Sequence, residues 1–336
     1  MSLSCTEHDF ARLKPLVFRL HCMKPDMRIQ VFEQIFHIHS VILKAHSEFF
    51  HKYLDSPDKK RAEPMSAFKY SWVTQIDDDG SWSLTAEQNT VPDEYQAEFT
   101  GIKEEEIAAF DTLLNAMYQN PIRFNSLDHL NLCAELADYY RCIPALSRAL
   151  EGGLLRSPEV TISFRGECCR VLAIARKLKH KLLFKEALIH SLGPWNAPRF
   201  EKLTDPTLRV VAGRALDGIL QKLGQFHTEL LDQAVHFGQE EQAWLDVYRK
   251  FYRMATEHRD VLGRTVIPAY FRAIADGIER LEIPRSLLGV MQPLTTNKLK
   301  FDVSDWRSGQ KGGAYYNSFL CGDIEDEDLP WEEDDD

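Results

Sequence analysis

The sequence, of 336 residues, lacks several features that would place it in a class of protein. No apolar run approaches the ~18–20 residues that a membrane span needs, so no transmembrane helix is expected. Residues 1–14 carry charges throughout and have none of the apolar stretch of a signal peptide. The seven cysteines form no Cys-x-x-Cys pair, and an odd number favours free thiols over a disulfide framework. We therefore expect an intracellular protein, either cytoplasmic or nuclear.

Motifs of enzymes and metal sites are also missing. Neither G-x-x-x-x-G-K-S/T nor G-x-G-x-x-G occurs, and H-E-x-x-H and G-x-S-x-G are absent. Four histidines lie close together, at positions 37, 39, 46 and 51, but no carboxylate or cysteine completes a recognisable set of ligands. Structural roles for these histidines are therefore favoured over a metal site. We expect no enzymatic activity, cofactor or metal; an enzyme with an unrecognised site in the helical half is an open alternative.

The net charge of −11 belongs mostly to one segment. Ten acidic residues and no basic residue lie between Asp323 and Asp336, which leaves 41 acids against 40 bases elsewhere. A nearly neutral body lacks the basic face by which proteins bind nucleic acid directly. The acidity is therefore a property of the end of the sequence rather than of the whole protein.

This acidic segment also contains Leu329-Pro330-Trp331, and two roles remain open. A flexible, solvated tail over residues 291–336 is favoured, because ordering many like-charged residues costs more than a few apolar side chains return. Truncation after Leu320 is then expected to leave the melting temperature nearly unchanged. In the alternative, Trp331 anchors a short motif that the acids steer to a basic patch, on a partner or at residues 176–181 of this chain.

Residues 15–155 combine short strands with helices. Segments 16–21 and 34–39 are rich in Val, Ile and Phe and are predicted to pair as strands, with Ser40 as the cap of the helix that follows. An alternating pattern runs on both sides of Asp79-Gly80, which predicts a β-hairpin over 68–86. Amphipathic helices are predicted from residue 103 onward, after Ser126 as a cap, and from Pro144 onward.

After Pro158 the apolar period is helical, over about 165–191, 204–223, 239–258 and 266–282. The sequence thus predicts an α+β fold: a small sheet packed on helices at 15–155, after an extension at 1–14, and an all-helical domain at 156–290. Within the predicted helix over 239–258, an aromatic stripe is formed by Trp244, Tyr248, Phe251 and Tyr252. Core packing is favoured for this stripe over a peptide-binding groove. With Trp331, the candidate interaction residues are Trp244, Tyr248 and Phe251.

Residues 36–50, Phe-His-Ile-His-Ser-Val-Ile-Leu-Lys-Ala-His-Ser-Glu-Phe-Phe, resemble the signature of the BTB/POZ domain, in which a strand ending in His precedes a helix with paired aromatics. Residues 107–121 are similar to a later helix of that domain. The hairpin at 68–86, as an insertion, and residues 182–195 resemble a subgroup of fungal BTB proteins. The resemblance implies structural roles for Phe36, His39, Leu43, Ser47, Phe49, Phe50, Phe110 and Tyr118, with Leu43 and Phe50 in the core.

This resemblance also implies a function. BTB/POZ domains are protein-interaction modules that form homodimers, and many recruit a client protein to a cullin-type ubiquitin ligase. We therefore expect an adaptor with protein partners, including a second copy of the chain and a cullin scaffold, and with no direct contact to nucleic acid or membrane. A nuclear regulator that acts through partners is the alternative, since no DNA-reading motif is present.

Overall fold

The computed structural model describes residues 14–56, 67–92, 97–236, 241–277, 285–301, 314–322 and 324–331. The chain divides into two compact units, Met1–Arg156 and Ser157–Asp336. A small sheet packed on helices forms the first unit, and helices make up the regular structure described in the second. The predicted α+β fold class is confirmed.

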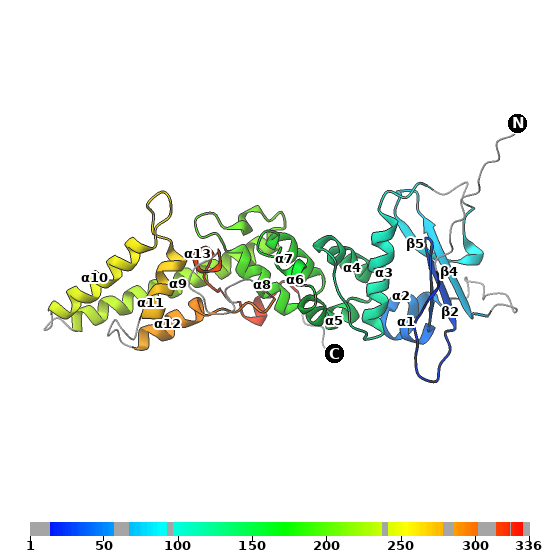
Figure 1. Ribbon diagram of the computed structural model, residues 1–336, viewed down its shortest axis with the longest axis horizontal. Helices are drawn as coiled ribbons and strands as arrows, with labels where there is room; N and C mark the ends of the chain where they lie inside the picture. The colour runs from blue at the N-terminus through cyan, green and yellow to red at the C-terminus, as the bar shows by residue number, and fades with distance from the viewer. Residues whose placement is uncertain are drawn as a thin grey trace, which may run out of the picture. The chain divides into compact units, whose positions relative to one another are not determined.

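The first unit contains the described sheet. In chain order, its elements are β1 (Leu16–Val17), β2 (Met27–Val31), β3 (Gln34–Ile38), α1 (Ser40–His46), α2 (Glu48–Tyr53), β4 (Tyr70–Ile76), β5 (Trp82–Ala86), the short 3-10 helix η1 (Glu87–Asn89), α3 (Lys103–Met117), α4 (Leu127–Tyr139) and α5 (Ile143–Leu155). Helices lie on one face of the sheet (Figure 1).

Within the described residues, the strands form one sheet in the order β1-β3-β2-β4-β5. β2 and β3 form an antiparallel hairpin whose turn contains Phe32, with a φ of 49°. β1 runs parallel to β3 and lies at the edge. β1 and β3 were predicted as a pair of strands. β2 was not predicted, although its apolar residues Met27, Ile29 and Val31 alternate and are fully buried.

The hairpin β4–β5 is present, but it is not an insertion. β4 pairs in parallel with β2, with Met27 opposite Tyr70 and Ile29 opposite Trp72, so it lies in the interior of the sheet. Its antiparallel partner β5 forms the far edge. Trp72 and Leu84 are both buried. The expected insertion at 68–86 is therefore wrong for β4, which pairs with β2 and whose inward-facing side chains pack into the main core.

That core is mainly aromatic. Five rings form a chain of contacts with centroids 5.4–5.9 Å apart: Phe36 to Phe110, Phe110 to Tyr140, Tyr140 to Phe50 and Phe50 to Trp72. Leu43 and Phe50 are fully buried, as predicted. Offset and edge-on aromatic contacts of this kind add to the free energy gained by burying the rings.

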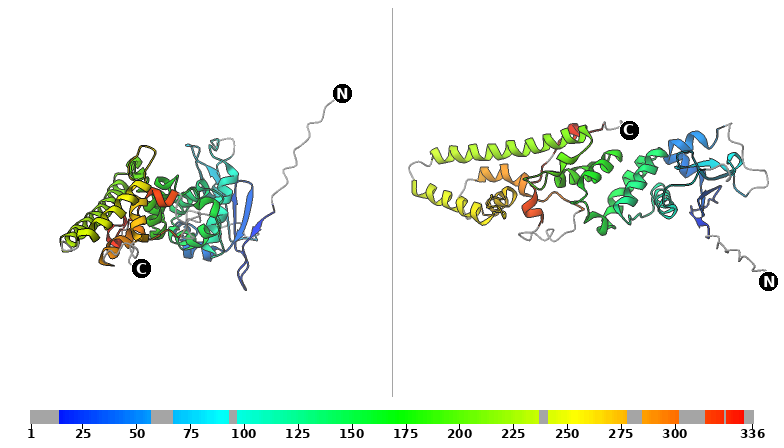
Figure 2. Two further views of the ribbon diagram at one scale, coloured as in Figure 1. Left: turned by 60° about the vertical axis from the view of Figure 1, so that its left-hand side comes forward. Right: turned by 90° about the horizontal axis from the view of Figure 1, so that it is seen from above.

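The second unit is helical. Its elements are α6 (Pro158–Thr161), α7 (Cys168–Lys177), α8 (Lys181–Ser191), the 3-10 helix η3 (Arg199–Lys202), α9 (Pro206–His236), α10 (Glu241–Glu257), α11 (Ile267–Gly277), α12 (Arg285–Thr295), α13 (Ala314–Ser318) and the 3-10 helix η6 (Asp326–Asp328). α9 and α10 run side by side (Figure 2). None of the helices in the described ranges is both long and apolar enough to cross a bilayer.

The predicted helix over 165–191 is two helices. α7 ends before Lys179, whose φ of 48° is left-handed and cannot continue a helix. α8 then starts afresh, because Nδ1 of His180 accepts the backbone N–H of Leu183 at 3.1 Å and so caps its first turn. A break of this kind leaves the apolar period nearly intact, which is why periodicity alone did not reveal it.

The chain from residue 314 to 331 differs most from expectation. Phe319, Leu320 and Cys321 are buried, and the backbone N–H of Cys321 donates to the carbonyl oxygen of Leu294 at 2.8 Å. Leu329 is also buried, against the expected flexible tail. The predicted flexible tail is wrong for these residues, because the apolar residues just before the acids belong to the core of the second unit. Truncation after Leu320 would therefore remove core contacts.

Candidate interaction surfaces

His39 stands at the junction between β3 and α1 and is fully buried. Its backbone N–H donates to the hydroxyl oxygen of Tyr118 at 2.7 Å, and its Nδ1 lies 2.9 Å from the same oxygen. Nε2 lies 3.3 Å from the carbonyl oxygen of Met23, which can only accept; a neutral ring is therefore protonated at Nε2, and Nδ1 accepts from Tyr118. Burial raises the pKa of Tyr118 to about 12, so this hydroxyl keeps its proton.

The start of α1 is held by a residue outside the predicted signature. The Asp26 carboxylate accepts the backbone N–H of Ser40 at 2.7 Å and its hydroxyl at 2.6 Å. Ser40 is thus the first helical residue and a donor, rather than the predicted cap. A carboxylate at a helix N-terminus satisfies free N–H groups and interacts favourably with the helix dipole. Asp26 is the residue that sequence reasoning missed.

Ser47 links the signature helices to a distant part of the domain. Its hydroxyl oxygen accepts the backbone N–H of Phe50 at 3.1 Å, which caps α2, and its O–H donates to the carbonyl oxygen of Tyr140 at 2.6 Å. Phe49, beside it, is half-buried and contacts the rings of Tyr53 and Tyr139. The signature residues therefore lie together and shape the domain; their contacts are structural.

The edge of the sheet at β1 is apolar and exposed. We define the β1 edge as Leu16, Val17, Met23 and Val41, whose exposed fractions lie between 42% and 50%. Met23 follows β1, and its carbonyl contact with His39 places it near the start of α1, where Val41 lies. β1 pairs with β3 along one side, and no strand among the described residues pairs with its other side, where a further strand could bind.

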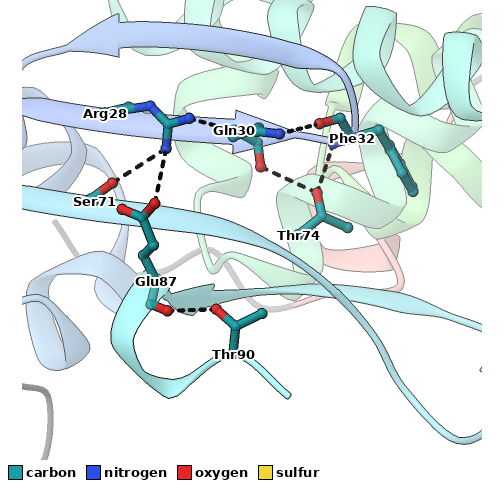
Figure 3. Close-up of polar contacts among 7 residues, drawn as sticks. All are labelled: Arg28, Gln30, Phe32, Ser71, Thr74, Glu87 and Thr90. Carbon is teal, nitrogen blue, oxygen red and sulfur yellow. Dashed lines mark hydrogen bonds and ion pairs between the residues drawn. The ribbon is translucent and has the colours of Figure 1, made fainter. Parts of the chain in front are cut away.

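The sheet face that carries Arg28 and Gln30 has a connected set of polar contacts (Figure 3). The Arg28 guanidinium donates to Gln30 and to the Ser71 hydroxyl, and it lies 3.9 Å from the Glu87 carboxylate. The Thr74 hydroxyl oxygen accepts from the backbone N–H of Phe32 at 2.8 Å. These contacts join β2 to β4 and to η1, so they support this face of the sheet.

No metal-binding cluster exists among the described residues, where groups of three or more His, Cys, Asp or Glu side chains in suitable positions do not occur. His37 lies on the same sheet face as Arg28, and its ring centroid is 4.6 Å from that of Phe68. Burial, with the charge of Arg28, lowers the pKa of His37. His39 is instead held by Tyr118, so the two histidines do not converge on one point.

A surface cavity of about 460 Å³ lies between the end of α3 and α5. Its walls include the apolar side chains of Ile122 and Ala145. The exposed side chains of Arg148 and Arg156 also line it. Among its lining residues there is no carboxylate, thiol or hydroxyl. The cavity offers cations and apolar surface for binding, without a nucleophile or general base.

The aromatic stripe on α10 is not one buried face. Phe251 is buried, whereas Tyr248 and Tyr252 are 70% and 64% exposed. The side chain of Trp244 lies outside the described residues. Trp331 is half-buried, and its ring lies edge-on to that of Phe184, with centroids 5.1 Å apart. Of the predicted interaction residues with described side chains, Tyr248 and Phe251 lie on α10, whereas Trp331 packs on Phe184 of α8.

Residues 18–76 match the family model of the BTB/POZ domain. The match covers β2, β3, α1, α2 and β4, and therefore includes the His39 junction and the Ser47 link described above. It also reaches Ile76, the last residue of β4, in agreement with the place of that strand inside the sheet. Comparison with curated proteins and with solved structures gave no match.

Proposed function

From the BTB/POZ domain that this chain carries, a protein–protein interaction module, we propose that the first unit joins two copies of the chain. We further propose that the assembled protein is an adaptor that recruits a client to a cullin-type ubiquitin ligase. The observation that carries the proposal is the family match at residues 18–76, and the β1 edge supplies the surface for dimerisation.

The β1 edge has the properties of a self-association surface. An edge strand with free backbone groups pairs with another strand, and exposed aliphatic side chains beside it gain free energy when a second copy covers them. Leu16 and Val17 supply the strand, and Val41 adds an aliphatic group from α1. A symmetric dimer would bring the same edge of each copy together.

The adaptor role rests on the family match rather than on a described contact. Cullin-binding members of the family often carry an apolar-x-Glu motif after α2. This chain has Arg61-Ala62-Glu63 there, with Arg in place of the apolar residue, and the stretch lies outside the described residues. The general adaptor chemistry needs no catalytic group, in keeping with the paired charges and the cavity lining described above.

Dimerisation is tested with the full chain by size-exclusion chromatography with light scattering. We expect the wild type at about twice its chain mass of 38.8 kDa, and Val17→Lys/Val41→Lys near the single-chain mass. Ile162→Lys is the control, because Ile162 is also an exposed aliphatic residue, 64% against 48% and 49% for Val17 and Val41, but lies on the second unit. A monomeric wild type, or a dimeric double variant that keeps its melting temperature, would contradict the proposal.

The cullin step is tested separately. A purified cullin N-terminal domain should be retained by the immobilised wild-type chain and also by Val17→Lys/Val41→Lys. Retention should be lost when the BTB/POZ core is unfolded by heat. Retention by neither native protein would reject the adaptor role and leave dimerisation standing.

A further inference from the structure

Residues 314–331 of the second unit contain two stretches held in different ways. Residues 318–322 belong to the core: Phe319 is buried, and the backbone N–H of Trp195 donates to the Ser318 carbonyl oxygen at 2.9 Å. Gly322 passes so close to α8 and α9 that an added Cβ would lie 2.8 Å from a methyl carbon of Leu192. This stretch cannot leave without opening the unit.

Residues 324–331, Ile-Glu-Asp-Glu-Asp-Leu-Pro-Trp, lie on the surface of the same unit, and we call them the acidic segment. Asp326 pairs with Lys181, and it lies 3.4 Å from the Nζ of Lys185. Asp328 lies 3.2 Å from the Arg214 guanidinium. All of these side chains are at least 28% exposed.

The receiving surface combines cations with an aromatic ring. Lys181, Phe184 and Lys185 are three and four residues apart on α8 and therefore share one face, and Arg214 comes from α9. We call these four residues the α8–α9 basic surface. The ring of Phe184 receives Trp331, and Ile324 and Leu329 are buried at the two sides of the charged residues.

These contacts make the acidic segment removable. Exposed ion pairs contribute little each, and salt screens them. The charges are complementary, and the apolar anchors are Ile324, Leu329 and Trp331. Residues 318–322 have backbone hydrogen bonds and buried side chains of their own, so we expect them to stay in place when the segment leaves. The segment thus occupies a surface that remains formed without it, as a ligand does.

We propose that the α8–α9 basic surface is a docking site for an acidic peptide segment of a partner protein, one with an aliphatic and an aromatic anchor, and that the acidic segment is its internal competitor. The chemistry of the partner is that of the present occupant: two carboxylates at alternate positions, followed by Leu and Trp. Because a tethered segment acts at an effective concentration of about 1 mM, a partner must bind more tightly than the segment does to displace it. This inference is independent of the dimer and of the cullin.

The test uses a fluorescent peptide with the sequence of residues 324–331 and the full chain, with binding measured by fluorescence anisotropy. Asp326→Lys/Asp328→Lys should release the internal segment, and this variant should bind the peptide about tenfold or more tighter than the wild type. Glu325→Lys/Glu327→Lys is the matched control, because it changes the charge equally at exposed residues that form no ion pair among the described residues. This control should bind like the wild type.

Specificity is tested on the chain released by Leu329→Ser/Trp331→Ala, whose Asp326 and Asp328 do not pair with a surface of reversed charge. Adding Lys181→Glu/Lys185→Glu to this chain should abolish binding of the peptide, and binding should return for a peptide with Lys in place of both Asp. Leu329→Ser/Trp331→Ala is a second way to release the segment if the charge reversal does not fold. The proposal is overturned if folded, released chains bind no peptide, or if wild-type and released chains bind equally. It is also overturned if release changes self-association in sedimentation velocity, since the occupant is then a second copy.

Discussion

In the first unit, side chains from distant positions fix the ends of helices; in the second, they fix backbone that returns from far along the chain. Ser47 reaches the backbone of Tyr140, 93 positions away, at a turn between helices. Glu186, on α8, accepts the backbone N–H groups of Lys300 and Phe301 between 2.7 and 3.1 Å, up to 115 positions away. The first unit therefore depends on its caps, and the second on late segments that have little regular structure of their own.

The largest expected effect breaks the sheet of the first unit. Deletion of residues 69–85, with a short Gly/Ser bridge, removes β4 and most of β5 and exposes the edge of β2 and the apolar face beneath Trp72. We expect loss of cooperative unfolding of this unit, measured by near-ultraviolet circular dichroism during a thermal scan. If the deletion variant still unfolds cooperatively at the wild-type temperature, the fold of this unit does not need the hairpin.

The next effect tests the second unit. Glu186→Ala leaves the backbone N–H groups of Lys300 and Phe301 without their acceptor and should lower the free energy of unfolding by about 3 kcal/mol. Glu186→Gln keeps one acceptor oxygen and should cost about 1 kcal/mol. Urea denaturation of the full chain measures both. Equal values for the two variants would mean that the carboxylate charge, not the hydrogen bonds, holds the returning segment.

A variant that lacks one helix cap tests how much that cap contributes to the free energy of unfolding of the first unit. Ser47→Ala removes the acceptor for the Phe50 N–H and the donor to the Tyr140 carbonyl oxygen, and it should cost about 1–2 kcal/mol in urea denaturation. Ser126→Ala is the matched control, since the Ser126 hydroxyl accepts the His129 N–H and caps α4. If Ser47→Ala costs no more than this control, the link to Tyr140 adds nothing to the cap.

A smaller effect depends on pH. Asp55 accepts hydrogen bonds from Lys44 and Tyr70, which lower its pKa from 3.8 to about 2. Because the folded pKa is the lower one, the stabilisation is complete above about pH 4 and disappears as the pH falls through about 2. Asp55 is exposed, so Asp55→Asn should cost under about 1 kcal/mol at neutral pH. Urea denaturation between pH 2 and 6 should show the two proteins converging at the acid end.

The smallest effect concerns a single hydroxyl. The Tyr140 side chain is fully buried, and its hydroxyl has no hydrogen-bond partner among the described residues. Tyr140→Phe keeps the ring stacked on Phe50 and should leave the stability unchanged or raise it by up to about 1 kcal/mol. Tyr118→Phe is the contrasting variant: it removes the contacts with His39 and should cost about 1–2 kcal/mol. A loss of stability in Tyr140→Phe would reveal a partner for its hydroxyl.

Local sequence patterns predicted those structural features that depend on residues close together in the sequence. The Ser126 cap, the β4–β5 hairpin and the burial of Leu43 and Phe50 follow from spacing and from residue types within a few positions. β2 carried the same alternating signal and was overlooked. The fungal resemblance and the cullin remain predictions.

Contacts that the tertiary fold creates could not be predicted in this way. Asp26 precedes β2 in the chain but accepts a hydrogen bond from Ser40, the first residue of α1. The place of β4 in the sheet is set by its pairing with β2 rather than by its own hairpin. The acidic segment shows the same limit, because its cations, Lys181 and Arg214, lie more than a hundred residues earlier in the chain. Of the basic patch suggested at 176–181, Lys181 contacts the segment, whereas Arg176 pairs with Asp205.

The return of residues 319–322 to α8 and α9 has a consequence for synthesis. A ribosome that has just completed Phe184 must add more than a hundred residues before Phe319 exists, which takes on the order of 10 s at cellular rates. During that time the apolar surface of Leu192 and Ile219, against which Gly322 finally packs, has no cover from this stretch. The first unit, by contrast, is complete before the second is begun. Nascent chains should therefore bind chaperones mainly through the second unit.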